Sequence, residues 1–392
     1  MKLLDNPVRR CAWGSADAIP RLLGTAADGE PQAELWLGAH ERLSSSVRVG
    51  DRSVPLGEMV ASDPAGCLGA GWAALERMPF LAKVIAVAQP LSLQVHPGAT
   101  IAERGHQSEN SAGLGRDHPR RNFPDPLAKT EMVFALEPFA VLCGFRPLAD
   151  MSAWLDALAV PALMPTAEAV RLHGRAALAD VTVRLLACPA AAELLADVSA
   201  RCTSLTMDPH WSVSAQVAGD LVRRYPDDPA VALALLLQPR VLAPGEAMFV
   251  QVGQPHTYLR GTAVEVQANS DNVLRAGLTE KHVDVTALAE ALDTGLDPAS
   301  TVVASRRGCE QVFAPPTPLF ALALIEQAAG DDLPVVPGPQ IFCCTDGSFD
   351  LADASGGLRL RRGQAAFVAA GDAHVRVRGS GQLLRVSTGR AG

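Results

Sequence analysis

Apolar and polar residues alternate near the end of the first hundred residues. Residues 78–96 read Met-Pro-Phe-Leu-Ala-Lys-Val-Ile-Ala-Val-Ala-Gln-Pro-Leu-Ser-Leu-Gln-Val-His and predict two strands that are broken at Pro90. Side chains two residues apart on a strand project from the same face. Ser92, Gln94 and His96 are therefore expected to lie together on one face of the second strand.

Between residues 150 and 238 the pattern changes to alanine- and leucine-rich stretches, such as 167–178 and 190–198. Strong helix formers at helical spacing predict an all-α insertion. The triplet Asp-Asp-Pro at 227–229 is typical of a helix N-terminus. It predicts a last helix over 230–237 that ends at the following Gln-Pro pair.

Short apolar stretches separated by glycine and proline dominate the rest of the chain. They predict strands at 247–252, 263–268, 319–326, 340–344, 358–360, 365–369 and 383–386. Many short strands with such turns indicate a barrel or a jelly roll.

Two of these stretches resemble one another. Residues 243–256 and 361–374 both run from a glycine through an apolar strand and a turn to a histidine. This similarity suggests an internal duplication of a cupin-like hairpin. In that interpretation His374 is the degenerate counterpart of His256.

The composition narrows the class of protein. With 392 residues the chain is too long for one ordinary core, and 48% hydrophobic with 19% charged residues is typical of a globular protein of two or three domains. The formal charge of -8 and the lack of a long Lys/Arg block argue against nucleic acid as a partner. An anionic substrate would need a local cluster of Arg and Lys.

No segment suggests export or a membrane. The first residues contain no apolar signal region, and the run 231–237 is too short to cross a bilayer, so a cytoplasmic protein without a membrane partner is expected. The eight cysteines form no CxxC pair and are expected to be reduced and mostly buried.

Four residues have side chains that suit a metal ion. Gln94, His96, Glu131 and His256 supply two imidazoles, one carboxylate and one amide oxygen, a set that suits zinc with an open position for water or substrate. A histidine on a strand is more often a hydrogen-bonded structural residue, and the spacing of Gln94 and His96 alone adds little against that alternative.

Several segments of the first 285 residues carry more specific information. They are Asn-Pro-Val-Arg-Arg-Cys-Ala-Trp-Gly-Ser at 6–15, Ala-Glu-Leu-Trp-Leu-Gly-Ala-His at 33–40, Pro-Leu-Ser-Leu-Gln-Val-His-Pro at 90–97, Asn-Phe-Pro-Asp-Pro at 122–126, Lys-Thr-Glu at 129–131, Leu-Cys-Gly-Phe-Arg-Pro at 142–147, Gly-Gln-Pro-His-Thr-Tyr at 253–258, and the longest, Glu-Val-Gln-Ala-Asn-Ser-Asp-Asn-Val-Leu-Arg-Ala-Gly-Leu-Thr-Glu-Lys, at 265–281. In these segments and in their order, the chain resembles the type I mannose-6-phosphate isomerases.

The resemblance implies a mainly β fold with an α-helical insertion, made of two cupin-like jelly-roll barrels plus a helical domain. The expected units are a discontinuous catalytic cupin domain over 1–149 and 239–300, a helical domain over 150–238, and a C-terminal cupin-like domain over 301–392. It also implies zinc-dependent interconversion of mannose 6-phosphate and fructose 6-phosphate through an enediol, a step of carbohydrate metabolism and GDP-mannose biosynthesis. The expected protein is a monomer with one zinc ion per chain and a small sugar phosphate as its partner.

The resemblance also assigns residues. It implies that Gln94, His96, Glu131 and His256 bind zinc, that Arg275 is the active-site arginine and Lys129 an active-site lysine, and that Ser92 and Lys281 contact the substrate phosphate. The chain departs from the family at two places: Ala128 stands where relatives often have histidine, and Gly-Ala-Thr at 98–100 replaces a more polar sequence. A base role for that histidine cannot apply here, and phosphate contacts from that loop are in doubt.

Aldose–ketose isomerisation needs a base, a stabiliser of the enediolate and a way to open the sugar ring. Arg275 suits stabilisation of the enediolate, and Lys129 suits proton handling or oxygen positioning. Glu265 and Asp271 are further acid–base candidates that the sequence does not rank.

Each of these roles has a structural alternative. Arg275 would be a structural ion pair, Lys129 a partner that orients Glu131, and Ser92 and Lys281 ordinary surface residues. The other histidines have no ligand spacing and are expected to be structural or exposed; they include His40, His106, His118, His173, His210 and His282.

Two other classes of protein compete with an isomerase. A non-catalytic cupin would keep the fold as a metal- or sugar-binding module. A cupin dioxygenase would use iron, for which a histidine-rich ligand set is expected. The retention of Arg275 and Lys129 beside the four metal positions argues against the first, and the presence of Gln94 and Glu131 argues against the second.

Overall fold

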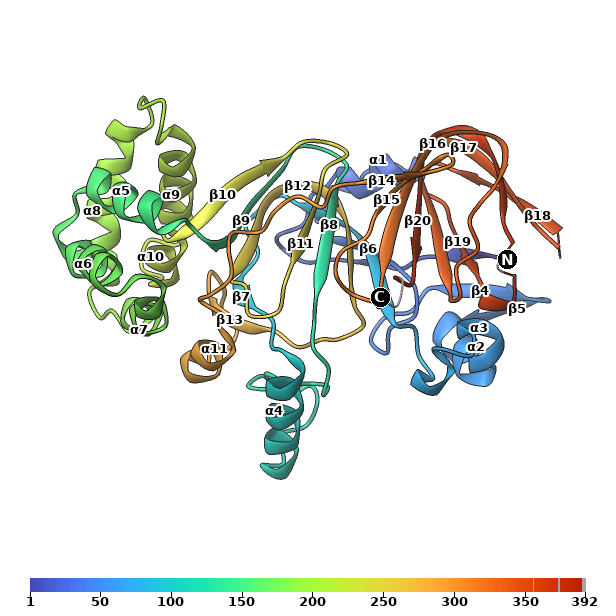
Figure 1. The fold of residues 1–392 in the computed structure, drawn as a ribbon, viewed down its shortest axis with the longest axis horizontal. Coiled ribbons are helices and arrows are strands. Elements are labelled where there is room, and N and C mark those ends of the chain that lie inside the picture. The colour runs from blue at the N-terminus through green and yellow to red at the C-terminus, as the bar shows by residue number, and fades with distance from the viewer. Residues whose placement is uncertain (355, 373, 390–392) are drawn as a thin grey trace.

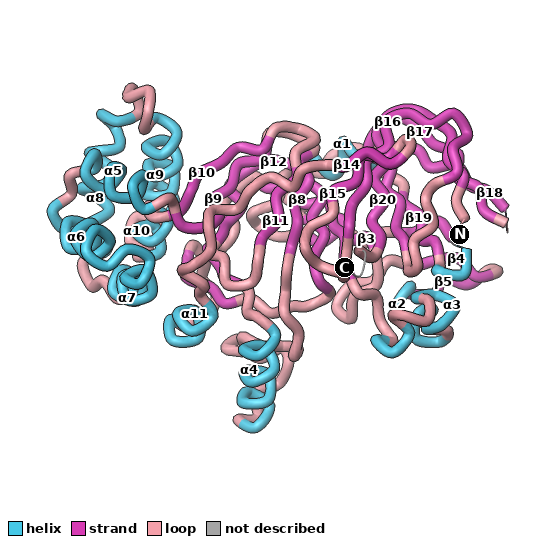
Figure 2. The backbone as a smooth tube through the Cα atoms, viewed as in Figure 1, coloured by secondary structure: helices cyan, strands magenta, loops and turns pink. Residues whose placement is uncertain are grey.

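The computed structural model describes residues 1–354, 356–372 and 374–389. Two large β-regions lie side by side, and a lobe of helices extends from one end of them (Figures 1 and 2). Among the described residues, the strands form two sheets of ten strands each. The expected fold class, mainly β with two cupin-like barrels and a helical domain, is confirmed. The last three residues of the expected unit 301–392 lie outside the described residues.

The first sheet lies next to the helical lobe and carries the expected metal ligands. Its strands are β2 (Val8–Arg9), β3 (Glu34–Leu37), β6 (Phe80–Val87), β7 (Leu93–Val95), β8 (Glu131–Ala135), β9 (Phe139–Phe145), β10 (Leu237–Leu242), β11 (Ala247–Val250), β12 (His256–Ala268) and β13 (Leu274–Gly277). The long strand β12 pairs with β6, β7, β8 and β9 along its length. It therefore joins the two sides of the barrel.

One face of these strands forms the inside of the barrel. An apolar cluster that includes Ile85, Val133 and Tyr258 fills part of the interior. Lys83 and Glu265 lie opposite one another on β6 and β12 and share the face of Ile85, because side chains two residues apart on a strand project together. Polar groups are thus enclosed beside an apolar core, a placement that calls for partners within the protein.

The second sheet contains the C-terminal strands and, unexpectedly, three strands from the start of the chain. Its strands are β1 (Lys2–Asp5), β4 (Ser46–Val49), β5 (Arg52–Pro55), β14 (Ser305–Arg307), β15 (Glu310–Phe313), β16 (Ala321–Asp332), β17 (Gln340–Asp353), β18 (Gly356–Arg361), β19 (Ala365–Val368) and β20 (Arg376–Ser387). Strand β1 pairs with β19 on one side and with β4 on the other. The expected domain boundaries did not include this pairing and stay a prediction.

The helical lobe occupies the region where an all-α insertion is expected. Its helices are α5 (Leu148–Leu158), α6 (Met164–His173), α7 (Leu178–Leu186), α8 (Ala191–Leu205), α9 (Ser212–Arg224) and α10 (Ala230–Ala234), with short 3-10 turns η2 (Pro161–Leu163) and η3 (Gly174–Ala177). The buried Trp154 lies in the core of the lobe, and the guanidinium of Arg146 lies over its ring.

The predicted end of the last helix, at residue 237, was wrong. Helix α10 ends at Ala234, and strand β10 begins at Leu237 and continues through Pro239. Residues 230–237 are all apolar and buried, so the side-chain pattern does not distinguish a helix from a strand there. Proline is tolerated in β10 because this strand lies at the edge of its sheet.

Further helices and 3-10 turns lie around the two sheets. They are α1 (Ala18–Leu23), α2 (Leu56–Ser62), α3 (Pro64–Leu68), α4 (Ala99–Ser111), α11 (Val285–Ala291), η1 (Ala73–Leu75) and η4 (Ala370–Asp372). None of the helices in the described part of the chain has the length and apolar character needed to cross a membrane. The eight cysteines are free, and five of them are buried.

The two similar hairpins differ at their histidines. Each places its apolar stretch in a strand, β11 or β19. His256 is completely buried, whereas His374 is exposed. The histidine of the first hairpin is thus enclosed in its barrel, whereas that of the second faces solvent.

Candidate metal centre

Three strands bring the expected ligands to one place inside the first barrel. Gln94 lies in β7 and His96 directly after it, while Glu131 and His256 are the first residues of β8 and β12. His256 lies opposite Gln94 in the strand register. His96, Glu131 and His256 are at most 1% exposed.

The ligand atoms of this group are close together. Nε2 of His96 lies 3.2 Å from Oε1 of Glu131, and Nε2 of His256 lies 3.6 Å from Oε2. One ligand atom from each of the three residues lies within 4.8 Å of the others. This is the spacing of donors that can converge on one ion, and the set of two imidazoles and one carboxylate suits zinc.

The second nitrogen of each imidazole is held by the backbone. Nδ1 of His96 donates to the carbonyl oxygen of Asn272 over 2.9 Å, and Nδ1 of His256 donates to that of Gln254 over 3.0 Å. A carbonyl oxygen only accepts, so Nδ1 carries the proton and the neutral form of each imidazole has its lone pair on Nε2. Nε2 of His96 is buried and has no hydrogen-bond partner among the described residues. A metal ion would satisfy it, as expected for an oriented ligand.

Gln94 faces the same group from β7. Its Nε2 lies 3.3 Å from Nε2 of His256, and its Oε1 accepts a hydrogen bond from the Ser92 hydroxyl at 3.2 Å. The two-residue spacing of Ser92 and Gln94 thus places their side chains in contact, as the alternation in the sequence predicts.

Lys129 and Tyr258 hold the carboxylate of Glu131. Nζ of Lys129 lies 2.8 Å from Oε1, and the Tyr258 hydroxyl donates to Oε2 over 3.2 Å. Burial opposes the charged form of Glu131, but the charge of Lys129, together with the contacts of the carboxylate with His96 and His256, outweighs burial and holds its pKa well below the ordinary value. Burial, followed by the Lys129 charge, lowers the pKa of His96 to about 4, so its imidazole is neutral.

A second polar group lies in the barrel interior. Nζ of Lys83 is 3.3 Å from Oε2 of Glu265 and 2.8 Å from Oε1 of Gln267, and it lies over the ring of Trp36. Burial and the Glu131 charge raise the pKa of Glu265. Burial lowers the pKa of Lys83, but the charges of Glu34 and Glu265 prevail and raise it.

Lys83 was missed in the sequence analysis, although a signal was present. It is the lone charged residue in the apolar stretch 80–87, all of which is buried. A charge in a fully buried strand needs a partner and marks a candidate site. Glu265, its partner, was already an acid–base candidate.

Positive charges gather near Gln94. Arg275 on β13 lies opposite Gln94 in the register, and burial lowers its pKa. Burial, then the charges of Arg275 and Arg9, lowers the pKa of Lys281. Arg9, which the sequence analysis did not select, also lies 3.3 Å from Glu34. The local cationic cluster that an anionic substrate requires is therefore present.

Asp271 lies on a loop beside the site. It contacts Nε2 of His40 at 3.3 Å and also pairs with Arg42 and Arg116. Burial alone would raise the pKa of Asp271, but hydrogen bonding to His40 and the charges of His40 and Arg42 hold it well below the ordinary value. His40 is buried and has a structural role in this ion-pair network.

Comparisons with known proteins agree with this geometry. Residues 1–148 match the family described as phosphomannose isomerase type I, catalytic domain. The chain is 36% identical to a mannose-6-phosphate isomerase of Escherichia coli (strain K12), over 98% of this chain and 99% of the relative. It is 35% identical to one of Salmonella typhimurium, with the same coverage.

Solved structures are similar over the whole chain. A mannose 6-phosphate isomerase bound with zinc and yttrium has a TM-score of 0.91 at 35% identity and covers 100% of both chains. The enzyme from Salmonella typhimurium bound to its substrate, fructose 6-phosphate, and to zinc has the same TM-score, identity and coverage.

Proposed function

The chain belongs to the type I phosphomannose isomerase family, and from this premise we propose which of its residues carry the reaction. The activity is the zinc-dependent interconversion of mannose 6-phosphate and fructose 6-phosphate. The observation that supports it most directly is the buried group of His96, Glu131 and His256, in which a lone pair of His96 has no partner among the described residues.

One zinc ion per chain would be held by these three residues and by Gln94. Gln94 can bind the ion through Oε1 if its side-chain amide rotates by about 180°. The Ser92 hydroxyl, which donates to Oε1 in the present orientation, would then accept a hydrogen bond from Nε2 of Gln94. When bound, zinc supplies a positive charge that polarises the substrate oxygens.

The reaction moves a proton between C1 and C2 of the open-chain sugar through an enediol. A guanidinium aimed at the developing negative oxygen stabilises such an intermediate. Arg275 is the proposed group, because it lies on the strand opposite Gln94 and is partly buried. In low-dielectric surroundings its charge acts more strongly than it would in water.

Glu265 is the proposed group that takes and returns the proton. Its raised pKa makes it a better base than an exposed carboxylate, and Lys83 holds it at a fixed position in the barrel. Lys129 keeps Glu131 charged and oriented, and its position beside the ligand also suits contact with a substrate oxygen. Ala128 leaves this reaction without the histidine that relatives often have there.

Lys281 and Ser92 are the proposed phosphate contacts, and Arg9 adds a third group to them. The charges of Arg9 and Arg275 both lower the pKa of Lys281. The phosphate would therefore meet positive groups from β2, from β13 and from the loop after β13. A local cluster of this kind is needed because the net charge of the chain is -8. We further propose that the protein acts as a monomer in the cytoplasm.

A coupled assay tests the activity. Mannose 6-phosphate is supplied to protein treated with a chelator, and fructose 6-phosphate is measured before and after zinc is restored. Turnover that disappears with chelator and returns with zinc is expected. Folded, zinc-loaded protein without turnover would instead indicate a non-catalytic binding module.

A further inference from the structure

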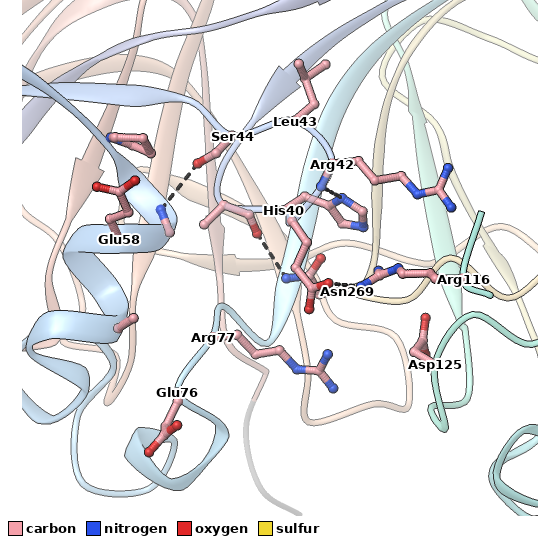
Figure 3. Close-up of a pocket in the computed structure, with 15 residues that line it drawn as sticks. His40, Arg42, Leu43, Ser44, Glu58, Glu76, Arg77, Arg116, Asp125 and Asn269 are labelled. Atoms are coloured by element: carbon pink, nitrogen blue, oxygen red, sulfur yellow. Dashed lines mark hydrogen bonds and ion pairs between the residues drawn. The ribbon is translucent and has the colours of Figure 1, made fainter. Parts of the chain in front are cut away.

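A cavity of about 570 Å³ lies beside the metal-bearing barrel, outside the group of metal ligands (Figure 3). The loop 39–44, helix α2, Arg77, Arg116 and Asn269 contribute to its walls. None of the four proposed zinc ligands is among the described residues that line it. Its volume is within the range of small-molecule sites.

Three arginines line this cavity, and one of them is unpaired. Arg42 and Arg116 both contact the carboxylate of Asp271, whereas the guanidinium of Arg77 has no ion-pair or hydrogen-bond partner in the part of the chain that the structure describes. Figure 3 shows the guanidinium groups of Arg77 and Arg116 pointing into the cavity from opposite sides. Nε of Arg116 is also buried without a partner among the described residues. Arg77 therefore offers a free fork of donors to an anion, whereas the two terminal nitrogens of Arg116 already contact Glu41 and Asp271.

The carboxylates of the cavity are not equivalent competitors for these arginines. Asp125 accepts hydrogen bonds from the Ser270 hydroxyl and the amide of Asp271, and Glu41 pairs with Arg116. Glu76, which also lines the cavity, is exposed. Glu58 is exposed on helix α2, on the wall opposite Arg116 in Figure 3. It is placed to accept hydrogen bonds from hydroxyl groups of a ligand.

Neutral groups complete the walls. Ala39, Ala61 and Pro55 give an apolar surface, and Oδ1 of Asn269 is buried without a partner among the described residues. An acceptor without a donor suits a ligand with hydroxyl groups. Apolar surface suits the carbon face of a sugar or polyol.

From these features we propose that the cavity is a second binding site for a small phosphorylated sugar or polyol. The phosphate lies beside Arg77, whose guanidinium can bind two of its oxygens, and reaches Arg116 by displacing Glu41 or Asp271 from that guanidinium. The hydroxyl groups face Glu58 and Asn269. This site is separate from the proposed catalytic one and does not depend on turnover.

The loop 269–272 connects the cavity to the metal centre. Asn269 lines the cavity, Asp271 is held by Arg116, and the carbonyl oxygen of Asn272 accepts from Nδ1 of His96. A phosphate that binds Arg116 competes with Asp271 for the same guanidinium. A compound bound in the cavity would therefore weaken the contact of Arg116 with the loop whose backbone orients His96. The bound sugar or polyol phosphate is thus expected to act as an effector of the isomerase.

Calorimetric titration with glucitol 6-phosphate tests the proposal. This polyol phosphate has no carbonyl group and cannot be isomerised. Zinc-loaded protein is expected to bind two molecules per chain. Arg77→Ala is expected to weaken one of the two binding events by at least about 10-fold and to leave turnover without the probe unchanged. Lys281→Ala is expected to weaken the other event, because Lys281 belongs to the proposed catalytic site.

Arg184→Ala is the matched control, since Arg184 is an exposed arginine on helix α7. It should retain both events. Arg77→Lys keeps the charge but not the planar fork, so its affinity for the probe should lie between those of the wild type and Arg77→Ala. Circular dichroism of each variant would detect a folding defect. A single binding event in the wild type, or two events with unchanged affinities in folded Arg77→Ala, would overturn the proposal. Isomerase turnover is measured separately, so either proposal can fail alone.

Discussion

Nζ of Lys129 lies 2.8 Å from Oε1 of Glu131, at the start of the strand that carries this carboxylate into the barrel. Both side chains are buried, so the pair is weakly screened by solvent. The lysine keeps the carboxylate ionised while it lies close enough to two imidazoles to share an ion with them. This one contact is consistent both with an orienting role of Lys129 toward Glu131 and with its proposed role in the reaction.

Replacement of Glu131 tests the metal centre. Glu131→Gln removes the only negative charge of the proposed ligand set and leaves Lys129 buried without its partner. Zinc affinity and kcat/KM are each expected to fall by at least about 100-fold. Zinc content by atomic emission and turnover are measured together. Glu168→Gln, an exposed substitution on α6, is the control; normal zinc content in Glu131→Gln would contradict the assignment.

Arg275→Ala tests stabilisation of the enediolate. Because the guanidinium would act on charge that develops during the reaction, kcat should fall by about 100- to 1,000-fold while zinc content is unchanged. Arg275→Lys should restore only part of the rate, since an ammonium lacks the planar fork. Near-normal kcat in Arg275→Ala would remove this residue from catalysis and leave it a structural role.

Glu265→Gln tests proton transfer in the barrel. The amide keeps the shape of the side chain and its contact with Lys83 but cannot take a proton. A fall in kcat of about 100-fold with little change in KM is expected. Steady-state kinetics with both sugar phosphates measure this, with Glu168→Gln again as the control. A change in KM alone would argue for substrate positioning instead.

Lys281→Ala tests the phosphate contact. Loss of one charged group is expected to raise KM for mannose 6-phosphate by about 10-fold with kcat nearly unchanged. Arg9→Ala should have a smaller effect, because its side chain is 45% exposed and also pairs with Glu34. Arg184→Ala should leave KM as it is in the wild type. An unchanged KM in Lys281→Ala would show that the phosphate binds elsewhere.

Asp271 predicts a pH dependence of stability. Its folded-state pKa is below the ordinary value, so its contribution is complete above the unfolded pKa and is lost as the pH falls through the folded pKa. Asp271→Asn is expected to lower the stability by about 1 kcal/mol at about pH 7, with a smaller difference from wild type near pH 4 and below. Thermal unfolding of both proteins across this range measures it. If the stability difference between wild type and Asp271→Asn grew toward acid pH, the predicted direction of this pH dependence would be wrong.

The sequence alone determined most of the local elements and which residue types could bind a metal. The alternation around Gln94 and His96 predicted a strand with both side chains on one face, and the short strands between glycines predicted the β architecture. Motifs in a family order assigned Glu131 and His256 to the same site before any geometry was known. Such predictions are possible because backbone periodicity and side-chain chemistry are set by residues that are close together in the sequence.

Tertiary structure alone decided which distant segments meet. The pairing of β1 with β19, the contact of Lys83 with Glu265 and the effect of the Arg9 charge on Lys281 all join residues far apart in the sequence. The end of α10 belongs to this group as well, since pairing of the next residues with β9 makes them a strand. Such contacts depend on which strands pair and on which residues lie opposite each buried charge. Both are properties of the packed chain and cannot be read from a local sequence pattern.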